Sequence, residues 1–347
     1  MIKKLLSLAV LLCMLAGIFC ACATQPQKNK YTAHSMDYFD TVTTITGYAY
    51  SQEEFDAVTD AVFSAFGEYD RLYSIYHRYN GLENLCTINE LVDGVHRTVT
   101  ADSRIIELLL YAKEMYTATN GVMNIAMGSV LSLWHDYRTV GKDNPSQASL
   151  PPVDKLKDAA LHCDIESMVI DEVNNTVTLT DPSMTLAVGA GAKGYAVECV
   201  AKELESQGIT GYVLNVGGNV RTIGTKADGT PWTVGIENPD GGEYLAYLNL
   251  QGQSVVTSGS YQRFYYVDGK PYHHIIHPDT LMPADLYVSV SVVCKDSGLA
   301  DALSTALFCM PLEEGLQLVE ATPDADAMWV DENGKQTVSS GWSQYTN

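Results

Sequence analysis

Positive charge is scarce in this chain. Its 347 residues include 42 aspartates and glutamates but only 21 lysines and arginines, and the formal net charge at pH 7 is −21. Proteins that bind nucleic acid carry a basic surface that neutralises phosphates. The composition therefore predicts no nucleic-acid partner and fits an exported domain with an acidic surface.

Long apolar runs are scarce as well, apart from residues 5–19, which follow Lys3 and Lys4. This run is too short for a confident membrane span and has the layout of an export signal. The Phe-Cys-Ala-Cys sequence that ends at Cys22 resembles a bacterial lipobox, with Ala21 as the small residue before cleavage. We expect Cys22 to be lipidated, although an ordinary cleaved signal peptide is the alternative.

These features predict three parts of the chain. Residues 1–21 form the signal peptide, 22–33 form the lipidated cysteine and a polar tether, and 34–347 form one domain. The expected location is the outer face of the cell membrane, to which the lipid attaches the protein.

Paired cysteine motifs are missing. The five cysteines beyond the anchor region are odd in number, widely spaced and free of any C-x-x-C pattern, which excludes a zinc-finger arrangement and names no disulfide. They are Cys86, Cys163, Cys199, Cys294 and Cys309.

Periodicity separates helix-rich from strand-rich stretches. Helical spacing covers residues 52–76, 102–119, 196–204, 297–310 and 312–321. Strand patterns cover 40–50, 168–170, 176–180, 212–216, 232–236, 244–250, 264–267, 272–276 and 287–293. Because the two kinds do not alternate strictly, the pattern predicts an α+β fold rather than a doubly wound sheet.

A glycine-rich stretch lies near the middle of the chain. A strand-like lead-in, 186–188, runs into Gly189, Gly191 and Gly194 and then into a helix, which suits an anion at a helix N-terminus. No acid follows the next strand, as a Rossmann fold would need, and no Lys-Ser/Thr pair follows the glycines, which excludes a Walker A loop. Close helix packing is the alternative, but Lys193 favours a ligand.

Two further segments carry polar groups. The turn at residues 215–219, Asn-Val-Gly-Gly-Asn, is on its own better explained as a tight turn. His273, His274 and His277 suggest a metal, but an extended segment points His273 and His274 to opposite faces, so a single ligand-contacting or catalytic histidine is the better interpretation.

An acidic residue and a hydroxyl share one helix face near the C-terminus. Asp301 and Thr305 are one turn apart, and their hard oxygens suit Mg²⁺ together with phosphate. For Asp301 alone, stabilisation by the helix dipole is the alternative.

In combination and in this order, the motifs resemble those of the ApbE family, the FAD:protein FMN transferases. The resemblance runs from about Phe39 to Met310. The matching segments are 190–197 (Ala-Gly-Ala-Lys-Gly-Tyr-Ala-Val), 215–219 (Asn-Val-Gly-Gly-Asn), 257–261 (Thr-Ser-Gly-Ser-Tyr), 274–278 (His-Ile-Ile-His-Pro) and 300–308 (Ala-Asp-Ala-Leu-Ser-Thr-Ala-Leu-Phe).

The resemblance implies a single α+β domain of ApbE type, related to the T-fold. It also implies Mg²⁺-dependent cleavage of FAD, the substrate, and attachment of FMN through a phosphoester to a Thr or Ser of an exported acceptor flavoprotein. By the family pattern, Asp301 and Thr305 ligate Mg²⁺ together with the carbonyl of Ala190, and His274 and Asp301 are catalytic. The expected FAD contacts are Phe39, Tyr76, Val122, Met123, Asn124, Lys193 and Ile275.

Several positions depart from the family pattern. Asn124, Ala187 and His277 each replace an aspartate that is usual there, Phe39 replaces a common methionine, and the segment 281–283 lacks a usual glycine. The metal-binding pair is intact, so we expect the phosphoryl chemistry to be retained.

Other functions remain open from the sequence. The same fold could release FMN and AMP from FAD with water as the acceptor. A flavin- or solute-binding lipoprotein without turnover is a second alternative, and a zinc hydrolase that uses the three histidines ranks last.

Overall fold

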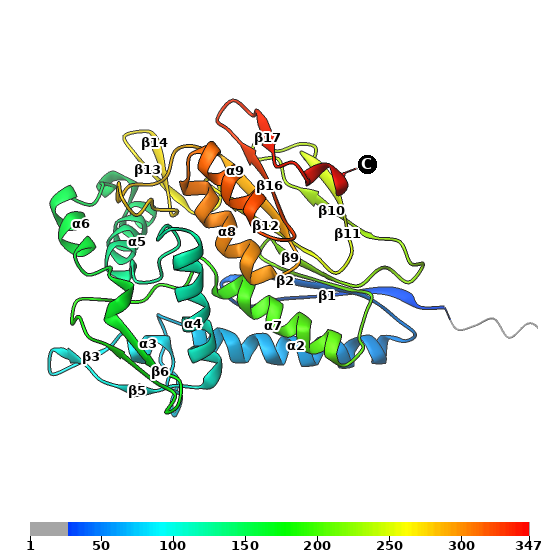
Figure 1. The fold of residues 1–347 in the computed structure, drawn as a ribbon, viewed down its shortest axis with the longest axis horizontal. Coiled ribbons are helices and arrows are strands. Elements are labelled where there is room, and N and C mark those ends of the chain that lie inside the picture. Colours follow the sequence, from blue (N-terminus) through cyan, green and yellow to red (C-terminus); the bar gives the residue numbers. More distant parts are fainter. Residues whose placement is uncertain (1–26, 347) are drawn as a thin grey trace, which may run out of the picture.

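The computed structural model describes residues 27–346, so the predicted signal peptide, Cys22 and the first part of the tether lie outside the described residues. Its centre is an eight-stranded sheet in which every neighbouring pair is antiparallel (Figure 1). In spatial order the strands are β1 (Asn29–Tyr38), β2 (Thr41–Ala49), β8 (Tyr212–Val216), β9 (Asn219–Ile223), β12 (Ser254–Gly259), β15 (Ser289–Cys294), β16 (Ala325–Val330) and β17 (Gln336–Val338).

The start of the sheet corrects the predicted domain boundary. β1 begins at Asn29 and pairs along its length with β2, so the predicted tether, 22–33, is wrong from Asn29 onward. The sequence concealed this strand because most of its residues are polar, and only a few on one face, such as Tyr31 and Ala33, pack against the core. No helix within residues 27–346 is both long and apolar enough to cross a membrane.

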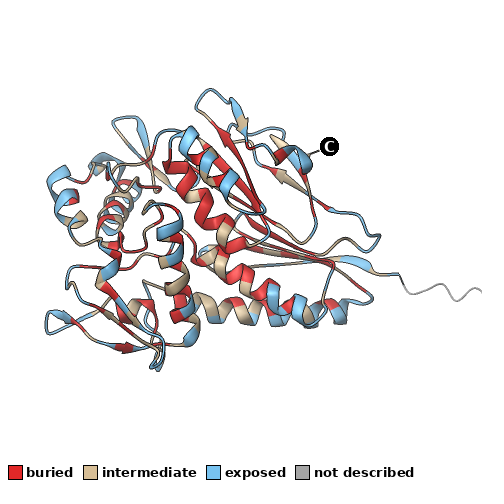
Figure 2. Cartoon of the chain, viewed as in Figure 1, coloured by how far each residue is buried: buried red, intermediate tan, exposed pale blue. Residues whose placement is uncertain are grey.

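Helices cover one face of the sheet. They are α2 (Gln52–Tyr73), α7 (Ala192–Ser206), α8 (Ser297–Cys309) and α9 (Leu312–Ala321). The other face is covered by the hairpin of β10 (Trp232–Ile236) and β11 (Ala246–Leu250) and by the short helix η3 (Trp342–Gln344). With both faces covered, every residue of β15 and β16 is buried, and Figure 2 shows these strands and α8 as the most continuously buried elements.

A second group of elements lies beside the sheet and builds the wall of the candidate site. It contains α3 (Leu85–Ile88), α4 (Ser103–Ala118), α5 (Gly128–Asp143), η1 (Pro145–Gln147), α6 (Val153–Ala160) and η2 (Ile165–Ser167). Small sheets accompany them: β3 (Leu91–Val92) with β4 (Val95–His96), β5 (Val99–Thr100) with β7 (Thr176–Leu179) and β6 (Met168–Asp171), and β13 (Phe264–Val267) with β14 (Lys270–His273).

The α+β class predicted from the sequence is confirmed, as are most predicted elements. The helix at residues 52–76 begins after Ser51, whose hydroxyl accepts from the Glu54 N–H as a cap should. The strand-like lead-in at 186–188 is wrong: these residues form no strand.

A single asparagine holds that lead-in instead. Asn89 donates from Nδ2 to the Leu186 carbonyl at 2.9 Å, and its Oδ1 accepts from the Leu186 N–H at 2.7 Å. The amide side chain therefore satisfies both backbone groups of Leu186 in the way a neighbouring strand would. This contact anchors the segment that leads into α7.

Asn89→Ala should lower the free energy of unfolding by about 1–3 kcal/mol, because both backbone groups of the buried Leu186 lose their partner. Urea unfolding of the variant and of Asn333→Ala, which changes an exposed asparagine, would measure the difference. Equal unfolding free energies for the two variants would contradict the anchoring role.

Candidate functional site

Two irregular segments, 122–127 and 185–191, run side by side into the starts of α5 and α7. The Ala187 N–H donates to the Ile125 carbonyl at 2.8 Å, and the Gly128 N–H donates to the Thr185 carbonyl at 3.1 Å. Met127 and Thr185 form an isolated parallel bridge between the segments. The glycine-rich stretch is therefore fixed against the segment in which the family resemblance places FAD contacts.

A row of polar contacts joins α7 to α8. The Gly194 N–H donates to Asp301 Oδ2 at 2.8 Å, and the Ser297 N–H donates to Glu198 Oε2 at 2.8 Å. The donors and acceptors on α7 are four residues apart, so they lie on one face of that helix.

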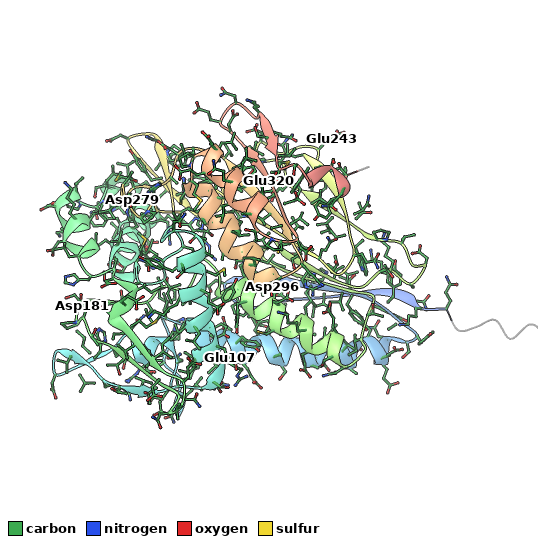
Figure 3. All side chains as sticks on the ribbon, in the orientation of Figure 1. Glu107, Asp181, Glu243, Asp279, Asp296 and Glu320 are labelled. Atoms are coloured by element: carbon green, nitrogen blue, oxygen red, sulfur yellow. The ribbon has the colours of Figure 1, made fainter. Side chains whose placement is uncertain are left out.

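A third contact, one turn further along α7, completes the row. Lys202 Nζ donates to Asp296 Oδ2 at 2.8 Å. Asp296, labelled in Figure 3 beside the start of α8, also caps that helix by accepting from the Gly298 and Leu299 N–H groups. α8 therefore runs antiparallel to α7, with Asp301 fixed at the N-terminus of α7.

Gly194 sets the distance between the two helices. A Cβ atom at this position would lie 2.4 Å from Asp301 Cβ and 2.5 Å from the Ser297 carbonyl oxygen. Only glycine permits this approach. The glycine-rich stretch therefore serves close helix packing, which the sequence left as the alternative to anion binding.

Asp301 and Thr305 provide oxygen donors suited to a magnesium ion. Asp301 is 7% exposed, and Gly194 occupies only one of its carboxylate oxygens. The Thr305 hydroxyl lies 3.4 Å from that of Ser258 in β12. A carboxylate and a hydroxyl one turn apart match the hard ligands of Mg²⁺, and Ala190 lies in the turn before α7, so the residues present fit the ion.

Lys193 interacts electrostatically with both Asp301 and Arg263. Its ammonium donates to the Val216 carbonyl at 3.3 Å. Burial lowers the pKa of Lys193, the nearby Arg263 lowers it further, and Asp301 opposes both effects. Lys193 therefore lies within electrostatic range of both Asp301 and Arg263.

The three histidines have different surroundings. His273 Nε2 lies 2.7 Å from the Ala284 carbonyl, and its Nδ1 accepts from the Ile275 N–H, so both ring nitrogens serve local structure. His277 Nδ1 accepts from the Asp279 N–H at 3.1 Å. Within residues 27–346 no group of three His, Cys, Asp or Glu side chains is placed to hold a metal.

His274 differs from His273 because one of its ring nitrogens makes no hydrogen bond to any described residue. Its Nδ1 is buried and has no hydrogen-bond partner within the described part of the chain. Burial, with Arg263 and Arg138 nearby, lowers the pKa of His274 to about 3, so the ring is neutral at physiological pH.

Two of the predicted FAD-contacting residues line a cavity of about 260 Å³. Val122 and Asn124 contribute to its wall, together with Gly121, Cys163 and Leu281. Met123 does not: its side chain is 2% exposed and packs against Gly191. Ile275 is likewise buried, at 7% exposure, so ligand contact by Met123 or Ile275 would depend on the backbone.

Phe39 and Tyr76 follow the ends of β1 and α2, and neither of them lines this cavity. Phe39 and Asp40 form the turn between β1 and β2 with φ of 56° and 51°, a left-handed pair that costs energy for residues other than glycine. Asp70 stabilises the turn by accepting from the Phe39 N–H at 2.9 Å. The Tyr76 ring contacts the His135 ring of α5 in a tilted arrangement, with centroids 5.5 Å apart.

Asn124 has a structural reason to depart from aspartate. Its Nδ2 donates to the Cys163 carbonyl at 2.9 Å, and its Oδ1 accepts from the Ala126 N–H at 2.8 Å. An ionised aspartate could not make the first of these bonds. Ala187 and His277 occupy backbone-paired positions, and nothing in the structure explains why they replace aspartate.

Sequence reasoning missed several residues that the fold brings to this region. Asp70, Arg138 and His135 lie outside every motif, and only the three-dimensional packing reveals them. Arg263 and Ser258 stand within or beside a quoted motif, yet neither had a distinguishing pattern that assigned it a role.

Comparisons with known proteins agree on one family. The family model described as the ApbE family matches residues 39–329. A FAD:protein FMN transferase of Klebsiella pneumoniae is 31% identical over 281 residues, covering 78% of this chain and 84% of that protein. A FAD:protein FMN transferase of Treponema pallidum is 33% identical over 259 residues, covering 70% of each chain.

A solved structure supports the same assignment. The crystal structure of the ApbE protein of Thermotoga maritima superposes with a TM-score of 0.80 at 26% identity. The match covers 92% of this chain and 100% of that protein.

Gly194→Ala should destabilise the protein by about 1–3 kcal/mol, because the added methyl group forces α7 away from Asp301 and Ser297. Gly189→Ala is the matched control, since nothing lies within 4 Å of its Cβ position. Thermal and urea unfolding would compare them. A Gly194→Ala protein as stable as Gly189→Ala would contradict the close-packing role.

Asn124→Asp should also lower stability at pH 7, by about 1–3 kcal/mol, because a carboxylate would face the Cys163 carbonyl without a proton to donate. Asn120→Asp provides the comparison, because Asn120 lines the same cavity but is exposed to solvent. Unfolding curves in which Asn124→Asp matches or exceeds the wild type would show that the amide bond is dispensable.

Proposed function

The chain belongs to the ApbE family, and from this premise we propose that it is a FAD:protein FMN transferase. The enzyme cleaves the diphosphate of FAD and attaches FMN through a phosphoester to a Thr or Ser hydroxyl of an acceptor protein. The observation that carries the proposal is the Asp301–Thr305 pair, fixed beside the N-terminus of α7 by the Gly194 N–H. A carboxylate suited to a metal ion, the N-terminal end of a helix and Lys193 lie together there, which supports the proposal.

The reaction balances without a further reactant. The bond between the FMN phosphorus and the bridging oxygen of the FAD diphosphate breaks, and AMP leaves with that oxygen. The acceptor hydroxyl oxygen bonds to the FMN phosphorus, and the hydroxyl proton is released. When bound, Mg²⁺ would neutralise charge on the phosphate oxygens, held by Asp301 and Thr305 with the carbonyl of Ala190.

The chain's own residues supply charge and orientation. Lys193 lies within electrostatic range of Asp301, and the positive end of the α7 dipole favours an anion there. Phosphoryl transfer depends mainly on such positioning and charge neutralisation, so no covalent intermediate on the protein is needed.

His274 is suited to receive the proton of the acceptor hydroxyl. Its ring is neutral, and its Nδ1 has no partner in the described chain. Burial is the main cause of its lowered pKa, and the positive charges of Arg263 and Arg138 add to it. A bound diphosphate would offset these two charges and so strengthen His274 as a base.

We further propose that Cys22 carries a lipid that attaches the protein to the outer face of the cell membrane, and that the acceptor is an exported flavoprotein. The apolar run at residues 5–19 and the lipobox-like end of that run support this location.

Asp301→Asn should abolish both AMP release and flavin transfer to an acceptor protein, lowering the rate by at least about 100-fold, because the carboxylate that holds the metal is lost. Thr305→Val should reduce the rate less, and EDTA should reproduce the Asp301→Asn effect in the wild type. In-gel flavin fluorescence and chromatographic AMP measurement would record both products, with the exposed Asp240→Asn as the charge-matched control.

The acceptor-free reaction separates the two enzymatic functions. With FAD and Mg²⁺ alone, a transferase should release little FMN, whereas rapid formation of FMN and AMP would identify a pyrophosphatase. Full activity of Asp301→Asn, or binding of FAD without any turnover in the presence of acceptor, would overturn the proposal.

A further inference from the structure

Two arginines near the candidate site have no acidic partner, although the chain carries twice as many acids as bases. Of the seven arginines, Arg78, Arg97, Arg104 and Arg221 form ion pairs, and Arg71 lies over the Tyr79 ring at 5.1 Å. For Arg138 and Arg263, no carboxylate of residues 27–346 lies within 4 Å. These two arginines are also each other's neighbours.

The hairpin of β13 and β14 places Arg263 beside His274. Phe264 and His273 form the last antiparallel pair, so Arg263 and His274 are the next residues at the open end. Residues opposite each other in an antiparallel pair project from the same face, which brings the guanidinium towards the imidazole.

α5 brings Arg138 to the same place. Trp134 stacks on Tyr272, and a Cβ at Gly141 would meet the Tyr265 ring at 2.6 Å, so the face of α5 that contains both residues packs on the hairpin. Arg138 lies between them on that face, four residues after Trp134. Repulsion from Arg263 adds to burial in lowering the pKa of Arg138, which agrees with this proximity.

Arg138 is held in position by its own helix. Its guanidinium donates to His135 Nδ1 at 3.1 Å, which requires that nitrogen to be the unprotonated acceptor. The His135 ring in turn contacts the Tyr76 ring in a tilted arrangement, with the planes inclined by 31°. The contacts thus run from Tyr76 through His135 to Arg138.

We infer that Arg138 and Arg263 together bind a phosphate group of the dinucleotide substrate, and that His135 positions Arg138 for this contact. The inference rests on the proposed function. Two adjacent guanidinium groups repel each other, and a phosphate between them would offset that repulsion and use their paired N–H donors. Lys193, within electrostatic range of Arg263 and Asp301, connects this cluster to the metal-binding pair.

Isothermal titration in EDTA would test the cluster with two probes, FAD and inorganic pyrophosphate. Arg138→Met and Arg263→Met should each raise the Kd for both probes about tenfold or more, since a charged hydrogen bond is worth that much. Arg97→Met, which removes the same charge from a surface pair, should leave both Kd values unchanged. Arg263 is exposed, so its variant should fold even if Arg138→Met does not.

The outcomes distinguish the inference from the proposed function. If the wild type binds pyrophosphate through these arginines but does not bind FAD, the proposed function fails and the anion site stands. Pyrophosphate binding that is absent from the wild type, unchanged in Arg263→Met, or equally weakened in Arg97→Met would overturn the inference.

A rescue experiment tests the positioning role of His135. His135→Ala should weaken pyrophosphate binding several-fold, and His135→Gln, which retains an acceptor for Arg138, should restore most of it. If the glutamine variant binds as weakly as the alanine variant, His135 does not act through Arg138.

Discussion

The close approach of α7 to α8 is the constraint on which the site depends. Three contacts spaced one turn apart on α7 join the helices: Gly194 to Asp301, Glu198 to the Ser297 N–H, and Lys202 to Asp296. We call these three contacts the α7–α8 seam. The seam holds Asp301, a residue more than 100 positions away in sequence, against the first turn of α7. Because Asp301 is buried, its charge is tolerable only where N–H groups and a lysine compensate it, and the N-terminus of α7 offers both.

The seam also explains why the glycine-rich stretch looked ambiguous. Gly194 is required for packing, whereas Lys193, the neighbouring residue, turns towards Val216 and the site. One short segment thus carries a packing function and a charge function, on different faces of the same turn. The two interpretations of the motif, helix packing and anion binding, are complementary.

Much of the fold could be predicted from the sequence because its signals are local. The Ser51 cap, the helical spacing of α8 and the Asp268–Gly269 turn, whose residues have φ of 49° and 78°, depend on neighbouring residues alone. β1 was missed because most of its residues are polar, and the order of strands in the main sheet depends on long-range pairing that no local pattern encodes. For the site, a recurring combination of motifs supplied Asp301, Thr305 and His274, but Arg138 and Asp70 carry no local signature.

The distribution of charge in the protein suggests a role for Arg138, which no sequence pattern identified. In a chain with a net charge of −21, an arginine can usually reduce its energy by pairing with one of many carboxylates. Arg138 instead donates to a neutral histidine, and Arg263 lies beside it, so the fold maintains a local excess of positive charge against the average of the whole surface. Two adjacent positive charges lower the stability of the protein when no anion is bound, and they favour the binding of an anion. Structural ion pairs, in contrast, are already neutralised and offer no such site. The acidic remainder of the surface would repel the same anion elsewhere, so the anion would be retained beside Arg138 and Arg263, with Lys193 within electrostatic range of Arg263.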